Sequence, residues 1–67
     1  MEITLNNQIQ TITEGVTLLD FVFSQLGEKQ NGVAVALNNM VIPKQNWPIT
    51  TLNSNDQILI IKATQGG

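Results

Sequence analysis

Apolar and polar residues alternate at the start of the chain, with Ile3 and Leu5 set between polar neighbours. A period of two predicts a strand that buries one face. Ile9 and Ile12 mark a second strand. Between the two lies the pair Asn6 and Asn7, and asparagine tolerates the positive φ angles of a tight turn. The N-terminal segment is therefore expected to form a β-hairpin.

A helical period follows Gly15. The apolar residues at one face of this segment are Leu18, Phe21, Val22 and Leu26, with Leu19 and Phe23 at the edge of that face and expected at the core margin. Thr17 stands three residues before Asp20, which is close to a capping box. Gly27 suits the position just after a helix, where a left-handed residue is common. The pattern predicts a helix over residues 18–26 that buries one face.

Three further strands are expected in the second half of the chain, over residues 33–37, 40–42 and 58–61. The pair Asn38 and Asn39 repeats the hairpin signal between the first two of them. Pro43 ends the short strand, because proline cannot donate to a ladder. Residues 44–56 resemble an irregular crossover, in which Trp47 is expected to anchor the loop against the edge of the core.

The expected order, two strands, a helix and three strands, predicts an α+β domain with two layers. A hairpin, a helical crossover, a second hairpin and a returning strand describe a β-grasp fold, with one helix packed on one face of a mixed five-stranded sheet. The last strand is apolar on both faces and should be central, between the first and third strands. Residues 1–62 would form this domain, and residues 63–67 a flexible C-terminal tail.

Composition limits the function. Sixty-seven residues make at most one domain, and the sequence has no Cys and no His, so it lacks thiolate ligands and the commonest general base. The net charge is −2, with three scattered lysines and no Arg, which disfavours binding to nucleic acid. The first residues alternate like a strand rather than a signal peptide, and no apolar run reaches the length of a membrane span. We expect a cytoplasmic protein.

The printed sequence ends in Thr64, Gln65, Gly66 and Gly67. Glycine has no Cβ, so two in succession form a thin strip of backbone that can enter a narrow channel. Four extended residues reach about 13–14 Å from a domain surface. A terminal carboxyl group has a pKa of about 3.3–3.7, so Gly67 would present an ionised carboxylate at neutral pH.

A second candidate site lies on the sheet. The residues of the third and fifth strands that we expect to face the helix are Val33, Val35, Leu37, Ile58 and Ile60. If they do, the residues that alternate with them point the other way: Ala34, Ala36, Leu59 and Ile61. No expected element remains to cover them. Small alanines beside larger aliphatics would form a shallow apolar patch of the kind that binds other proteins, unless the crossover loop or a second copy covers it.

Several segments together resemble the ThiS family of sulfur carriers: residues 32–38, Val41 to Lys44, Trp47, residues 56–59 and the terminal Gly66-Gly67. The resemblance implies a ubiquitin-like β-grasp and a protein-bound sulfur donor in thiamin biosynthesis rather than an enzyme. It implies that a ThiF-type enzyme uses Mg-ATP to adenylate Gly67, that a persulfide donor converts the adenylate to a thiocarboxylate, and that the thiazole synthase ThiG takes the sulfur. Gln65, Gly66 and Gly67 would enter the partner active site. The chain itself would bind no cofactor or metal.

Three other functions stay open. The molybdenum-cofactor sulfur carriers and the ubiquitin-like protein modifiers share the fold, the Gly-Gly end and the adenylation step. A plain β-grasp interaction module would have an inert tail. An independent enzyme is disfavoured, because the sequence offers no nucleophile–base pair, metal cluster or phosphate loop.

Overall fold

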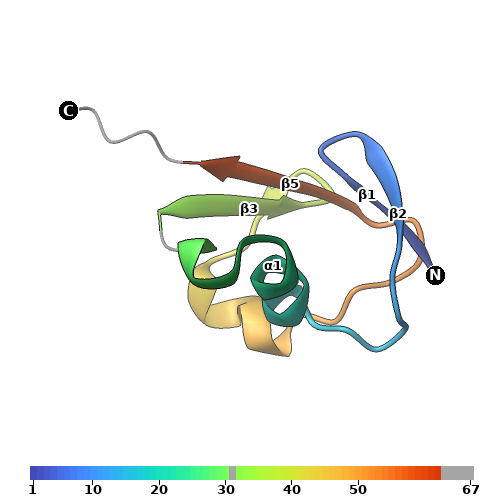
Figure 1. The fold of residues 1–67 in the computed structure, drawn as a ribbon, viewed down its shortest axis with the longest axis horizontal. Coiled ribbons are helices and arrows are strands. Elements are labelled where there is room, and N and C mark those ends of the chain that lie inside the picture. The colour runs from blue at the N-terminus through green and yellow to red at the C-terminus, as the bar shows by residue number, and fades with distance from the viewer. Residues whose placement is uncertain (31, 63–67) are drawn as a thin grey trace.

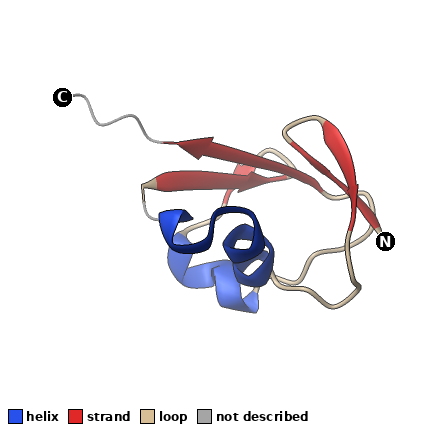
Figure 2. Cartoon of the chain, viewed as in Figure 1, coloured by secondary structure: helices blue, strands red, loops and turns tan. Residues whose placement is uncertain are grey.

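The computed structural model describes residues 1–30 and 32–62. Its elements are β1 (Glu2–Leu5), β2 (Gln8–Thr11), α1 (Leu18–Leu26), η1 (Gly27–Gln30), β3 (Val33–Leu37), β4 (Met40–Val41), η2 (Lys44–Ile49) and β5 (Gln57–Lys62). The strands form one sheet, and the helices gather on one side of it (Figures 1 and 2). None of the described helices is long and apolar enough to cross a bilayer.

The sheet has the strand order β2-β1-β5-β3-β4. Each hairpin pairs its strands antiparallel, β5 runs antiparallel to β3, and β5 runs parallel to β1. The predicted central position of the last strand is therefore confirmed, as is the mixed five-stranded β-grasp sheet with its helix on one face. The strand is central in the sheet, but only one of its faces is buried: Ile58 lies in the core, whereas Ile61 on the other face is exposed.

Both predicted Asn-Asn turns are present. Asn6 and Asn7 have φ angles of 48° and 70°, and Asn38 and Asn39 have φ angles of 51° and 70°. Two consecutive positive φ angles are those of a type I′ turn, whose twist matches that of the flanking strands. Asparagine supplies these angles here without glycine.

The helix begins and ends where the sequence predicted. The Oγ1 atom of Thr17 accepts a hydrogen bond from the Asp20 backbone N–H at 3.1 Å, which satisfies one free donor of the first turn. Gly27 follows the last residue with φ 59°. Leu19 packs at the core margin as expected, but Phe23 is 53% exposed, so its predicted place at the margin is wrong. Five residues of helix rotate Phe23 about 140° away from Leu18, and this turns it off the buried face.

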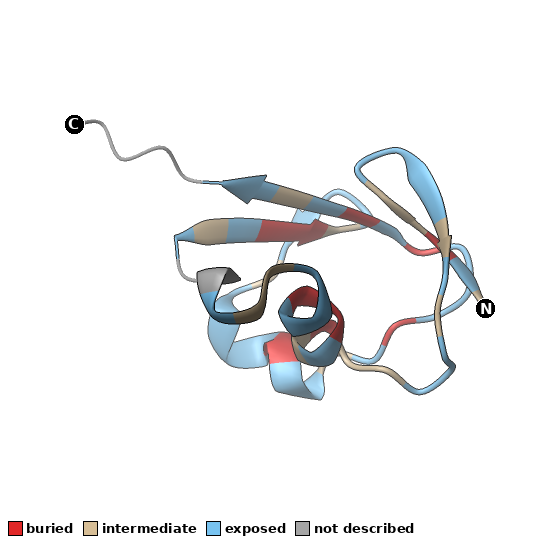
Figure 3. Cartoon of the chain, in the orientation of Figure 1, coloured by how far each residue is buried: buried red, intermediate tan, exposed pale blue. Residues whose placement is uncertain are grey.

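The core lies between α1, the sheet and the crossover segment (Figure 3). Its buried members are Ile3, Leu18, Phe21, Val22, Val35, Trp47, Leu52 and Ile58. The crossover that the sequence presented as irregular contains the 3-10 helix η2 and contributes two of these residues. The indole Nε1–H of Trp47 donates to the Ile42 carbonyl at 2.9 Å. The predicted anchoring role of Trp47 is confirmed.

A buried carboxylate organises the entry into β5. Asp56 is only 8% exposed. Its Oδ2 atom accepts from the Asn53 backbone N–H at 2.7 Å, and its Oδ1 atom accepts from Asn38 Nδ2 at 3.0 Å. These bonds tie the loop before β5 to the second hairpin turn, and nothing in the sequence beyond a turn-rich composition predicted them.

Candidate functional site

The strand β5 carries the chain towards the Gly-Gly terminus. It runs through the centre of the sheet, and its arrowhead points away from the N-terminus (Figure 1). Its last residue, Lys62, lies opposite Val33 of β3. The predicted tail, with Gln65, Gly66 and Gly67, lies outside the described residues. The site can therefore be built from the strand that leads to the tail and from the sheet around that strand.

The four residues of the predicted patch lie together on the sheet. In the β3–β5 register, Ala34 is opposite Ile61 and Ala36 is opposite Leu59. Directly opposed residues share a face, and these two pairs follow each other along the strands. The neighbouring pair of Val35 and Ile60 belongs to the other face, where both contact the core. The outward placement that alternation predicted is confirmed, while the docking role of the patch stays a prediction.

Exposure is uneven across this patch. Ile61 is 54% exposed and Leu59 is 36% exposed, and Ala34 is also exposed. Ala36, however, is only 7% exposed, so the expectation that nothing covers it is wrong. Its register partners Leu59 and Val41 flank it, and we attribute the low exposure of its single methyl group to their longer side chains. Ala36 forms the floor of the patch, and the larger residues supply the accessible area.

Val41 is a member of this face that the sequence analysis missed. It lies opposite Ala36 across the β3–β4 hairpin and is 65% exposed. The signal was available, because a two-residue turn at Asn38 and Asn39 fixes the register and places residue 41 opposite residue 36. We define the outer patch as Ala34, Ala36, Val41, Leu59 and Ile61. None of these side chains carries a charge, so a partner would recognise the patch by its shape and apolar area.

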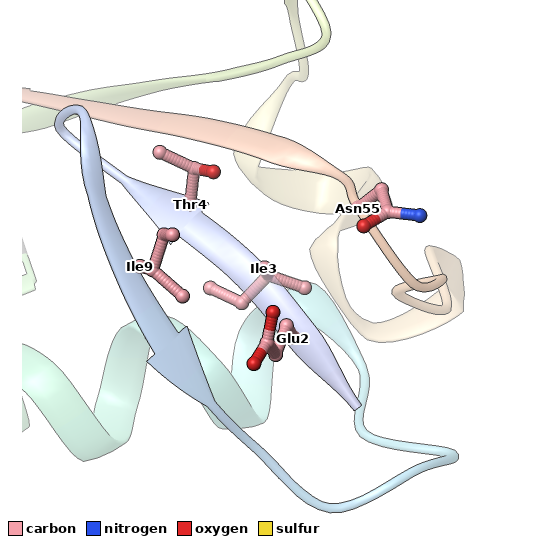
Figure 4. A pocket seen from close by; sticks show the side chains of 5 residues that line it. All are labelled: Glu2, Ile3, Thr4, Ile9 and Asn55. Atoms are coloured by element: carbon pink, nitrogen blue, oxygen red, sulfur yellow. The ribbon is translucent and has the colours of Figure 1, made fainter.

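A pocket lies elsewhere, near the start of β5 (Figure 4). It is lined by Glu2, Ile3, Thr4, Ile9 and Asn55. Glu2 is the one ionisable side chain in this lining, and the lining contains no second acid and no His, Lys or Cys that could act with it or activate the Thr4 hydroxyl. Among residues 1–30 and 32–62, no group of three acidic, His or Cys side chains is placed to hold a metal ion. The pocket therefore offers no recognisable catalytic arrangement.

The comparisons with known proteins agree with the fold. A crystal structure of the thiamine biosynthesis protein (ThiS) from Geobacter metallireducens superimposes with a TM-score of 0.88 at 22% identity, covering all of both chains. A solution structure of a thiamine biosynthesis protein from the same organism gives a TM-score of 0.81 at 22% identity, covering all of this chain and 88% of that one. At this level of identity, the two structures support the fold alone.

Sequence comparison goes further. The chain is 31% identical to the sulfur carrier protein ThiS of Escherichia coli over 67 residues, which is the full length of both chains. Residues 3–67 match the profile of the ThiS family, so the match includes the Gly-Gly end. The resemblance seen in the sequence is thereby confirmed, and this chain belongs to the ThiS family.

Proposed function

We propose that this protein carries sulfur for the thiazole ring of thiamin, on the carboxyl group of Gly67. The observation that carries the proposal is the family match over residues 3–67, which runs through the terminal Gly66-Gly67. The match favours the thiamin pathway over the molybdenum-cofactor carriers and the protein modifiers. The protein would act as a cosubstrate of partner enzymes and not as a catalyst.

The chemistry begins with activation. A carboxylate oxygen of Gly67 attacks the α-phosphorus of ATP in a ThiF-type enzyme, pyrophosphate leaves with Mg²⁺, and an acyl adenylate forms. The ATP and Mg²⁺ belong to the partner, and the chain itself needs to bind neither. Activation is required because an oxide ion is a very poor leaving group, whereas AMP leaves readily. We place this reaction in the cytoplasm, where ATP is available.

Sulfur enters in the second step. The outer sulfur of a persulfide attacks the acyl carbon, AMP leaves, and an acyl disulfide joins Gly67 to the donor. A further thiol then cleaves the S–S bond, which releases the thiocarboxylate and leaves a disulfide on the donor side. Because the sequence contains no Cys, the persulfide and the cleaving thiol must both come from partners. The thiazole synthase ThiG would then accept the sulfur.

The outer patch would hold the activating enzyme while the tail reacts. It lies on β5 and its neighbours, beside the point where the chain leads on to Gly67. Leu59, Ile61 and Val41 supply exposed apolar area on one face of the sheet. A partner that covers this face would gain affinity from the burial of apolar area, and the carrier would need no reactive side chain of its own.

Intact mass spectrometry tests the proposal. The protein is incubated with a ThiF-type enzyme, Mg-ATP and a persulfide donor, beside a variant that lacks Gly67. We expect a mass gain that corresponds to one oxygen replaced by sulfur in the full chain and no gain in the variant. An unchanged mass, with an enzyme shown to be active on its own carrier, would contradict the proposed function. An isopeptide adduct in place of the mass gain would favour a protein modifier.

A further inference from the structure

The side chain of Asn6 reaches a residue that lies 54 positions later in the chain. The backbone N–H of Ile60 donates to Asn6 Oδ1 at 2.9 Å. Asn6 Nδ2 in turn donates to the Ile60 carbonyl at 3.5 Å, a longer and weaker bond. The backbone N–H of Asn6 also donates to the Ile58 carbonyl at 2.9 Å. Asn6 is therefore bonded to β5 through both its backbone and its carboxamide.

These side-chain bonds extend the hydrogen-bond ladder between β1 and β5 beyond its last backbone pair. The parallel register of β1 and β5 ends with Leu5 opposite Ile58, because the chain turns away at Asn6 with a positive φ angle. A parallel strand would next offer a backbone carbonyl to Ile60. The side-chain carbonyl of Asn6 takes that place, so β5 is held from the β1 side up to Ile60.

The other hairpin turn holds the opposite end of the same strand. Asn38 Oδ1 accepts from the Gln57 backbone N–H at 2.9 Å, and the Asn38 backbone N–H donates to the Gln57 carbonyl at 2.8 Å. The side chain of the first asparagine in each turn is thus hydrogen-bonded to one end of β5. Of these two asparagines, Asn6 bonds to the end that leads to the carboxyl terminus, so a substitution of Asn38 serves as the control for the same change at Asn6.

We propose that Asn6 is a positioning residue that fixes where the chain leaves the sheet on its way to Gly67. This inference rests on the proposed function for its consequence in the reaction. Without the Asn6 carboxamide, the end of β5 is held by β3 alone, through the pairs of Ala34 with Ile61 and Val33 with Lys62. A less constrained end must lose more conformational freedom when the terminus enters the activating enzyme. This additional entropy cost weakens binding of the protein to the activating enzyme and leaves the rate of the chemical step unchanged.

The test compares three glycine variants, since glycine keeps the positive φ angle of each turn position. Asn6→Gly removes the carboxamide that bonds to Ile60. Asn7→Gly changes the same turn and leaves that carboxamide in place. Asn38→Gly removes the corresponding bond to Gln57 at the other end of β5, together with the bond to Asp56. Asn6→Asp is the conservative substitution, because its side chain keeps an acceptor for the Ile60 N–H.

Two readouts separate positioning from a general loss of stability. The first is hydrogen exchange at the Ile61 amide, which pairs with β3 and does not itself bond to Asn6. One hydrogen bond changes an opening equilibrium by about 2- to 10-fold, so Asn6→Gly should speed this exchange by about that factor. The second is the adenylation kinetics, in which KM should rise by a similar factor while kcat stays within about twofold. Asn7→Gly should leave both values near the wild type, and Asn6→Asp should retain most of the exchange protection. Asn38→Gly also loses the bond to Asp56, so it should lower the free energy of unfolding while Ile61 exchange rises less than in Asn6→Gly and KM stays near the wild type.

Equal exchange rates at Ile61 in the Asn6→Gly and Asn38→Gly variants would overturn the proposal, as would a fall in kcat with KM unchanged. The exchange experiment needs no partner enzyme. If the wild-type chain were not adenylated, the proposed function would fail on that result, and the positioning role would be decided by the exchange rates.

Discussion

Replacing Ile61 with Asp should weaken docking of the activating enzyme and leave the domain folded. Ile61 lies on the outer patch with 54% of its surface exposed, on the face of β5 that turns away from α1. Its neighbour Ile60 packs against the core on the opposite face. The substitution therefore tests the accessible side of the strand and spares the buried side.

The magnitude follows from the exposed fraction. Burying a whole isoleucine side chain contributes about 1.5–3 kcal/mol, so covering the exposed 54% of Ile61 contributes about 0.8–1.6 kcal/mol. Loss of that contribution alone weakens binding by about 4- to 15-fold. Aspartate adds the cost of covering an unpaired charge, so we expect a loss of roughly tenfold or more. The cost to folding at this half-exposed strand position is about 1 kcal/mol or less.

The dissociation constant of the complex with a ThiF-type enzyme, measured by calorimetric titration, gives the effect directly. Ile9→Asp is the matched control. Ile9 is 72% exposed, and its pairing with Thr4, which is opposite Gln57, places it on the outward face near the other end of β5. We expect near wild-type affinity for this control. Equal affinity in both variants and the wild type would refute the docking role, and unfolding of Ile61→Asp would show that Ile61 belongs to the core.

Three further predictions concern the core, the entry to β5 and the terminus. Trp47→Phe removes the donor to the Ile42 carbonyl, and chemical denaturation should show a loss of about 1–3 kcal/mol; an unchanged midpoint would argue against the anchoring role. Asp56→Asn replaces one acceptor oxygen by a donor facing Asn38 or Asn53, and the same measurement should show a loss of about 1–3 kcal/mol, whereas a neutral effect would mean that the bonds are not needed. Gly67→Ala adds a methyl group beside the reacting carboxylate, and since a displacement of 1 Å can cost about 100-fold in rate, pyrophosphate release by the activating enzyme should fall by roughly tenfold or more. A normal rate would show that the channel admits a side chain.

Local patterns predicted the elements of this fold because its local preferences agree with its tertiary structure. The helical period and its caps located α1 to the residue, and alternation assigned the two faces of β3 and β5. The hairpin turns at Asn6 and Asn38 could be predicted from the sequence because positive φ angles restrict the residue type. Each of these features depends on neighbours within a few positions.

Contacts between distant segments could not be predicted in the same way. Nothing near Asn6 in the sequence indicates that its carboxamide bonds to Ile60, and nothing near Asp56 indicates its bond to Asn38. The two turn asparagines look alike in sequence, and their different partners on β5 come from the strand order. The shielding of Ala36 likewise depends on side chains from two neighbouring strands.

The most direct test of sulfur donation by Gly67 follows the sulfur atom itself. The Gly67 thiocarboxylate would be prepared with a heavy sulfur isotope, purified, and incubated with thiazole synthase and its remaining substrates in a single turnover. We expect the isotope to appear in the thiazole product while the intact mass of the protein returns to that of the carboxylate. An unlabelled product, or a thiocarboxylate that persists while thiazole forms, would contradict sulfur donation by Gly67.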